Sequence, residues 1–294
     1  MDNRTDRPAP ALDDLWDYDD PAASEARFRA AVESAVAAGD AAAADEARTQ
    51  LARSLGLQGL FDDARTELDR VDGSHPADDR IRVRSLLERG RAIRSAGDPA
   101  ASVPLFERAW ALARKLGEDG LAVDAAHMLA IVDAPPGEPA WHRLALELAD
   151  TSPHSTAQRW RGSLWNNVGW ARFGAGDLDG ALTAFGTALD ARREQGRPKE
   201  TRVAEWSVGR CFRALGRVPE ALAIQQRVEA ETVRADEPED GYVSEEIGEC
   251  LLALCRGAAA RPWFARAARL LGVDVWLLEH EPDRIERLRR LGDD

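Results

Sequence analysis

Two short segments of the chain combine residue types that are suited to recognising a peptide or an anion. Asn166 is followed four positions later by Trp170, and Trp206 is followed four positions later by Arg210. Residues i and i+4 share one face of a helix, so each pair would present its two side chains together. An arginine fork holds a carboxylate or phosphate, an asparagine amide both donates and accepts hydrogen bonds, and an indole offers apolar and cation–π contact. The pattern therefore favours a binding surface.

The sequence contains no motif typical of a catalytic, nucleotide or metal site. The five histidines have no HExxH or C-x-x-C context, and neither a Walker A loop nor a G-x-S-x-G elbow occurs. The cysteines Cys211, Cys250 and Cys255 are odd in number and lack zinc-knuckle spacing. We therefore expect no catalytic residue, no metal and no cofactor, and we expect the protein not to be an enzyme.

Composition and charge narrow the class of protein further. The 294 residues include 44% hydrophobic side chains and carry a net charge of −13, a sign that opposes general binding to nucleic-acid phosphates. The opening MDNRTDRPAP has no apolar region of a signal peptide, and no apolar run is long enough for a membrane span. Arginine supplies nearly all the positive charge, as high-GC codon usage produces. A cytoplasmic, bacterial protein without nucleic-acid or membrane partners is the expectation.

A helix-turn-helix pattern recurs along the chain. Its clearest copy has a small Gly169 where a second helix must approach, Gly176 at the turn, and Phe185 on the apolar stripe of the second helix. Related skeletons stand at Ala52, Leu55, Gly59, Phe61, Ala64, Leu68 and Pro76, at Gly90, Ile93, Gly97, Phe106 and Ala109, at Gly209, Gly216, Val218, Ala221 and Val228, and at Gly248, Leu251, Ala260, Phe264 and Ala267.

This order of large, small, aromatic and turn residues resembles the tetratricopeptide repeat over about residues 41–273, with a degenerate copy between Gly120 and His154. Turn glycines lie 38 or 40 residues apart, against the family's period of about 34, so the longer-unit variant is indicated. The resemblance implies an all-α fold: a right-handed α-solenoid of about six to seven helix-turn-helix units with a C-terminal capping helix.

We expect three regions. Residues 1–20 form an acidic, partly disordered segment, residues 21–280 the solenoid, and residues 281–294 the capping helix and tail. The first ten residues are expected to be disordered, whereas Leu12, Leu15, Trp16 and Tyr18 should dock on a first helix spanning residues 24–38, with Ser24 as its N-cap. A further hypothesis is that the acidic stretch around Trp16 occupies an arginine groove and blocks it.

In the family, the first helix of each unit lines a concave groove, and this placement carries over to particular residues here. It predicts a ligand-binding set of Asn166, Asn167, Trp170, Trp206, Arg210, Arg213, Glu249, Arg91 and Arg94. The set is similar in kind to the carboxylate clamps of chaperone-binding members, with arginines in place of lysines. The opposing interpretation is that Arg210 and Arg213 are solvated or paired with Glu205, Glu245 or Glu249.

The resemblance favours a protein- or peptide-binding scaffold or adaptor whose Asn/Trp/Arg groove prefers an acidic or carboxylate-bearing ligand. The alternative is a sensor of an anionic small molecule, or an unorthodox enzyme, using the same pocket. A third possibility is a regulator that acts in trans, because longer-unit arrays accompany regulatory domains in bacteria.

Overall fold

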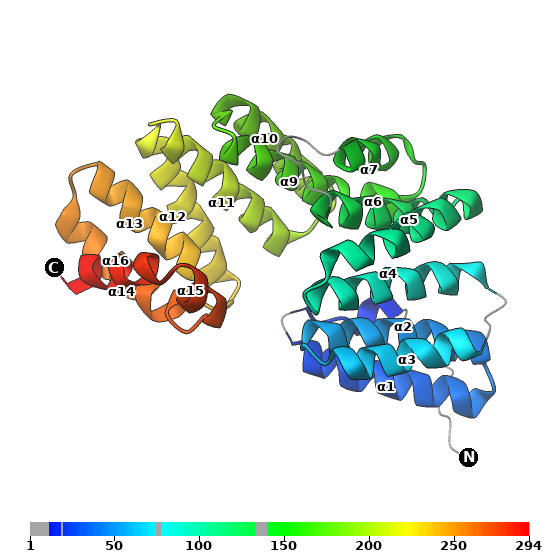
Figure 1. Cartoon of the computed structure of the whole chain (residues 1–294). Helices are drawn as coiled ribbons and strands as arrows, with labels where there is room; N and C mark the ends of the chain where they lie inside the picture. Colours follow the sequence, from blue (N-terminus) through cyan, green and yellow to red (C-terminus); the bar gives the residue numbers. More distant parts are fainter. Residues whose placement is uncertain (1–11, 19, 75–77, 133–139, 294) are drawn as a thin grey trace, which may run out of the picture. The chain divides into compact units, whose positions relative to one another are not determined.

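The computed structural model describes residues 12–18, 20–74, 78–132 and 140–293, and in these ranges the chain is helical and contains no strand. The predicted disorder of the first ten residues lies outside the described ranges. Figure 1 shows helices that follow one another through short turns. In chain order the elements are η1 (Leu12–Leu15), α1 (Pro21–Ala38), α2 (Ala41–Leu57), α3 (Phe61–Gly73), α4 (Asp79–Ser95), α5 (Pro99–Leu116), α6 (Asp119–Val132), α7 (Ala140–Thr151), α8 (Ser155–Gln158), α9 (Arg161–Gly174), α10 (Leu178–Glu194), α11 (Pro198–Ala214), α12 (Val218–Arg234), α13 (Gly241–Ala253), α14 (Gly257–Leu271), α15 (Val275–His280) and α16 (Pro282–Asp293).

The chain divides into two compact units, which we call unit 1 (up to Trp160) and unit 2 (from Arg161). Unit 1 contains α1, the pairs α2/α3, α4/α5 and α6/α7, and the short α8; unit 2 contains α9/α10, α11/α12 and α13/α14, followed by α15 and α16. The first helix of each pair also contacts the first helix of the next pair within its unit. We call the surface formed by these first helices the first-helix face of a unit. The predicted all-α fold of stacked helix-turn-helix pairs is confirmed.

The turns form where the glycine pattern predicts them. Gly97 and Gly176 end the first helices of their pairs with φ of 102° and 81°, a backbone conformation that suits glycine. The next residues, Asp98 and Asp177, accept hydrogen bonds from backbone amides in the first turn of the second helix. One short Gly-Asp step therefore stops one helix and starts its partner.

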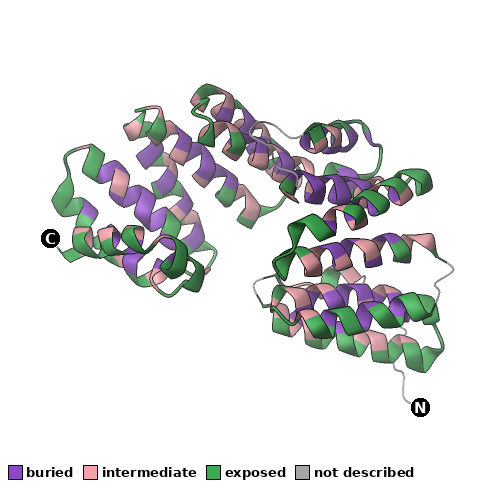
Figure 2. Ribbon diagram, viewed as in Figure 1, coloured by how far each residue is buried: buried purple, intermediate pink, exposed green. Residues whose placement is uncertain are grey.

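The paired helices approach closely because glycine on one helix faces phenylalanine on the other. A Cβ added at Gly169 would lie 2.4 Å from the Phe185 ring, which is too close for any side chain. The same relation holds for Gly90 with Phe106 and for Gly248 with Phe264. All three rings are buried, and Figure 2 shows the buried stripe that the paired helices share.

The first helix begins earlier than the sequence pattern predicts. Asp20, not Ser24, is the N-cap of α1, and its carboxylate accepts a hydrogen bond from the amide of Ala23. Proline at the first helical position, Pro21, suits this start because the missing N–H would have no partner there. The buried Ser24 hydroxyl instead donates to the carbonyl of Asp17, so the prediction of Ser24 as the cap was wrong.

The segment before α1 docks within unit 1. Leu12, Leu15 and Trp16 pack against a core cluster that includes Phe28, as predicted, and the Trp16 indole donates a hydrogen bond of 3.1 Å to Gln50 of α2. Tyr18 stacks on Trp16 at 4.7 Å but stays 62% exposed. This aromatic pair covers the end of unit 1 at α1 and α2.

No described helix is long and apolar enough to cross a lipid bilayer. At the C-terminal end, α16 buries Ile285 and Leu288 and packs against α14, so an amphipathic helix covers the last pair of unit 2.

Candidate functional site

Three aromatic rings run across the first-helix face of unit 2, one from each helix pair. Trp170 on α9, Trp206 on α11 and Tyr242 on α13 follow one another at intervals of 36 residues, and neighbouring ring centroids are 5.7 and 6.1 Å apart. The two indoles are half-buried, and Tyr242 is 36% exposed. We call these three residues the aromatic row. The rings lie 6, 10 and 13 residues before the turns at Gly176, Gly216 and Cys255, so each stands about one helical turn farther back along its helix than the one before.

Arg210 lies beside the aromatic row. Its guanidinium carbon is 5.9 Å from the Trp170 ring centroid and 5.8 Å from that of Trp206, within range of cation–π attraction. One guanidinium nitrogen donates to the carboxylate of Glu246 at 2.6 Å. The structure therefore brings together Trp170, Trp206 and Arg210, as the sequence predicts.

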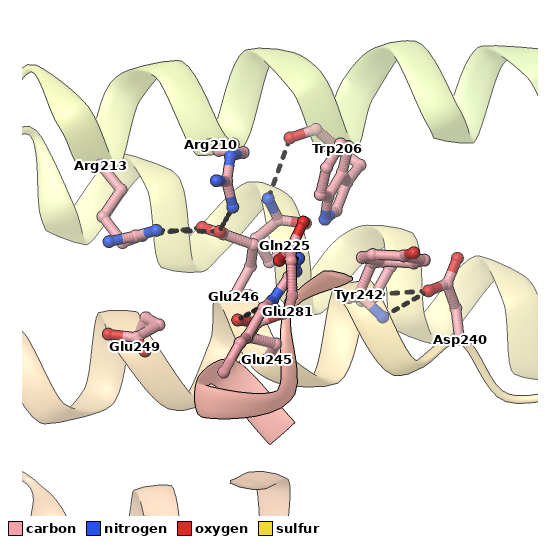
Figure 3. Close-up of polar contacts among 12 residues, drawn as sticks. Trp206, Arg210, Arg213, Gln225, Asp240, Tyr242, Glu245, Glu246, Glu249 and Glu281 are labelled. Atoms are coloured by element: carbon pink, nitrogen blue, oxygen red, sulfur yellow. Dashed lines mark hydrogen bonds and ion pairs between the residues drawn. The ribbon is translucent and has the colours of Figure 1, made fainter. Parts of the chain in front are cut away.

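Glu246 is the residue that sequence reasoning missed. Its carboxylate is almost fully buried and accepts two hydrogen bonds from Arg213, of 2.7 and 2.9 Å, besides the one from Arg210 (Figure 3). The hydrogen bond to Glu246 raises the pKa of Arg213, so this arginine stays charged. The opposing interpretation was right that the two arginines are paired, but Glu205, Glu245 and Glu249 were the wrong partners.

The α13 carboxylates of Glu245 and Glu249, considered as partners of Arg210 and Arg213, bind arginines of the capping helix α16 instead. Arg284 of α16 donates to Glu245 at 3.0 Å, and Arg287 donates to Glu249. The Arg284 guanidinium also lies 5.4 Å from the centroid of Tyr242. Glu249 is thus held by α16, and α16 closes the row at the Tyr242 end.

The two asparagines lie on α9. The Asn166 carbonyl accepts a hydrogen bond of 3.3 Å from the Ser207 hydroxyl, which joins α9 to α11. Asn167 is half-buried. Polar contacts of this kind therefore connect successive first helices in unit 2: Asn166 with Ser207, then Arg210 and Arg213 with Glu246.

Two donors beside the aromatic row have no hydrogen-bond partner in the described part of the chain. They are the indole N–H of Trp206 and the Nε–H of Arg210, and both atoms are buried. An unsatisfied buried donor costs about 1–3 kcal/mol, so such groups call for an explanation. An acceptor brought by a ligand would satisfy them after a small movement of the two side chains.

The remaining predicted residues belong to unit 1. Arg91 donates to Glu88 at 2.5 Å and to Asp124, and Arg53 reaches Glu88 at 3.4 Å. Arg94 is exposed on α4. Arg91 is therefore part of an ion-pair chain between α2, α4 and α6.

Two histidines meet where the degenerate repeat forms α6 and α7. The His127 and His142 rings lie 6.5 Å apart between centroids. Burial lowers the pKa of His127 to about 4, although the Asp124 carboxylate opposes the shift and His142, Arg91 and Arg53 add to it. Among the described residues, no group of three His, Cys, Asp or Glu side chains is placed to hold a metal ion.

The buried His127 predicts a specific dependence of stability on pH. Its pKa in the folded chain lies below the unfolded value of about 6.5, so the unfolded chain binds more protons between about pH 6.5 and 4. Stability should therefore fall as the pH is lowered through this window. His127→Gln is expected to flatten that fall in urea unfolding curves, whereas His280→Gln, at an exposed position, should leave it unchanged. An identical fall in wild type and His127→Gln would contradict the prediction.

Comparison with known proteins agrees with this architecture. Residues 169–232, from within α9 to within α12, match the family model of the tetratricopeptide repeat. No curated protein matches the chain at a significant level. Among solved structures, a Rap protein complexed with Competence and Sporulation Factor is 16% identical, covers 84% of this chain and 75% of its own, and has a TM-score of 0.53, which shows a shared fold.

Two further solved structures are similar over nearly their whole length. A tetratricopeptide repeat protein from Parabacteroides merdae is 15% identical over 96% of both chains with a TM-score of 0.44. The TPR domain of P58(IPK) is 16% identical, covers 95% of this chain and 96% of its own, and has a TM-score of 0.35. Residues 169–232 thus contain tetratricopeptide repeats, and the helix pairs described above have the fold of such repeats.

Proposed function

We propose that the chain is a scaffold that binds a peptide segment of a partner protein along the aromatic row of unit 2. The observation that carries the proposal is the row itself: three partly exposed rings, one per repeat, at separations of 5.7 and 6.1 Å. Side chains two residues apart on an extended peptide are spaced by roughly 6.6 Å and point to the same side. The rings therefore match alternate residues of an extended peptide.

The polar groups beside the row indicate what else the peptide carries. Arg210 and Arg213 share the single carboxylate of Glu246, so one positive charge of this group is left to attract an acidic ligand. The unsatisfied N–H groups of Trp206 and Arg210 favour one hydrogen-bond acceptor placed at the row. We propose that this acceptor is an acidic side chain or a terminal carboxylate, which Arg210 holds while the rings contact apolar groups.

The general role is in keeping with the family, whose members are generally non-enzymatic scaffolds that bind proteins. The Rap protein that shares the fold was solved in complex with Competence and Sporulation Factor, so a bound factor is compatible with such helix pairs. A row spread over three helices also suits an extended chain better than a compact metabolite.

Peptide display against the full chain tests the proposal. Peptides enriched on the wild type should bind Trp206→Ala and Tyr242→Ser at least about tenfold more weakly, because aromatic contacts of this kind dominate binding energy. Val233→Ser, a change at an exposed position of α12, is the matched control and should bind normally. Amidation of the peptides' acidic groups should weaken binding to the wild type but not to Arg210→Gln. Enriched peptides that bind both aromatic variants as tightly as the wild type would overturn the proposal.

A further inference from the structure

Four apolar side chains are exposed together at the C-terminal end of unit 2. Val273, Val275, Trp276 and Leu278 are 77%, 67%, 57% and 41% exposed. They lie on α15 and the turn before it, labelled in Figure 1 and drawn as exposed in Figure 2. We call these four residues the α15 patch. Scattered apolar residues are common on protein surfaces, whereas neighbouring exposed apolar side chains that form one patch mark interaction sites.

The α15 patch stands on a well-anchored element. Leu277, between the exposed residues, is buried in the core cluster that also contains Leu271 and Ile285. Asp274 caps the helix by accepting from the amide of Leu277, and the His280 ring stacks on the Trp276 indole at 4.7 Å. The apolar side chains are therefore presented outward by a helix whose opposite side is fixed to unit 2.

Three exposed carboxylates lie on α15 or within three residues of its ends. Asp274, Glu279 and Asp283 are exposed, and none of the three has an ion-pair partner among the described residues. The neighbouring Arg284 is already engaged by Glu245 and Glu281. The rim of the patch therefore carries negative charge that the chain itself leaves unpaired.

We propose that the α15 patch is a second docking surface, separate from the aromatic row, for a basic amphipathic helix of a protein partner. Such a helix buries Val275, Trp276 and Leu278 under its apolar face and removes their exposed apolar surface from water. Its lysines or arginines pair with the carboxylates at the rim. A second copy of the chain fits less well, because a net charge of −13 makes two copies repel each other.

A pair of designed peptides tests the proposal on the full chain. A fluorescent amphipathic helix of leucine and lysine should bind the wild type, and the matched leucine–glutamate helix should not. The double variant Val275→Ser with Trp276→Ala should weaken binding by about tenfold or more, and so should Glu279→Lys with Asp283→Lys. Val233→Ser keeps the net charge and removes an exposed apolar side chain elsewhere, so its binding should be unchanged. All changed positions are exposed, and unaltered thermal melting would show that the variants fold.

Several outcomes would overturn the proposal. Equal binding of the leucine–lysine helix to all variants would mean attraction by the overall negative charge. Binding of the leucine–glutamate helix with similar affinity would mean that the carboxylates near the patch do not select a basic partner. Self-association in sedimentation that the apolar double variant abolishes would assign the surface to a second copy, and cosedimentation with zwitterionic vesicles would assign it to a membrane. This test is independent of the proposed function: variants of the aromatic row that lose binding of displayed peptides should still bind the leucine–lysine helix.

Discussion

Glu246→Gln should lower the free energy of unfolding by roughly 3 kcal/mol, the lower part of the range for breaking a buried ion pair. The carboxylate is 1% exposed and accepts from both Arg210 and Arg213, whose side chains are 28% and 27% exposed. Removing its charge leaves two guanidinium groups side by side without their shared counter-ion. Glutamine keeps the volume, so the loss would report charge and hydrogen bonding rather than packing.

The matched control is a solvent-exposed ion pair in the same unit. Glu220 of α12 pairs with Arg217, the residue just before the helix, and both side chains are about half exposed. Glu220→Gln should leave the free energy of unfolding nearly unchanged, because exposed ion pairs contribute little. Urea unfolding of both variants makes the comparison. Equal losses would mean that Glu246 does not hold the first-helix face of unit 2 together.

Phe185→Ala is expected to cost roughly 3–5 kcal/mol, the usual range for emptying a buried aromatic site. The ring is fully buried between α9 and α10, where it fills the space that Gly169 leaves free. It also supports the aromatic row, because the Trp170 ring rests against it at 5.0 Å. Phe185→Leu, which keeps most of the volume, should cost less.

A double-mutant cycle shows whether the glycine and the ring act as one unit. Gly169→Ala alone should destabilise by about 1–3 kcal/mol, since its Cβ would collide with the ring at 2.4 Å. Added to Phe185→Ala, the same methyl group finds open space, so the combined loss in urea unfolding should be smaller than the sum. Additive losses would contradict the packing described here.

Much of the fold follows from local patterns. Gly59, Gly97, Gly176 and Gly216 all have positive φ at the turns where the repeat predicts them. Glycine opposite phenylalanine marks the close approach in the pairs α4/α5, α9/α10 and α13/α14, and in α11/α12 Gly209 faces Gln225 instead. These signals are encoded within one repeat. The turns and the helix pairs can therefore be predicted without knowing how successive repeats are rotated relative to each other.

The partners on the first-helix face could not be predicted in the same way. Repeat positions singled out Glu245 and Glu249, but the residue that reaches Arg210 is their neighbour Glu246. One residue turns the side chain by about 100° around a helix, so a small rotation between helices changes the partner. The pairing of Arg91 with Asp124 depends on the same rotation. The anchored, exposed α15 gave no repeat signal at all, because it lies beyond the last helix pair.

The stagger of the aromatic row bears on how such a surface changes over evolutionary time. Trp170, Trp206 and Tyr242 lie 6, 10 and 13 residues before the turns at Gly176, Gly216 and Cys255, so each ring comes from a different position of its repeat. Copying one whole helix pair would therefore place the new ring out of line with the others and would not lengthen the row. Point substitutions such as tryptophan to tyrosine are the simpler route by which each contact changes.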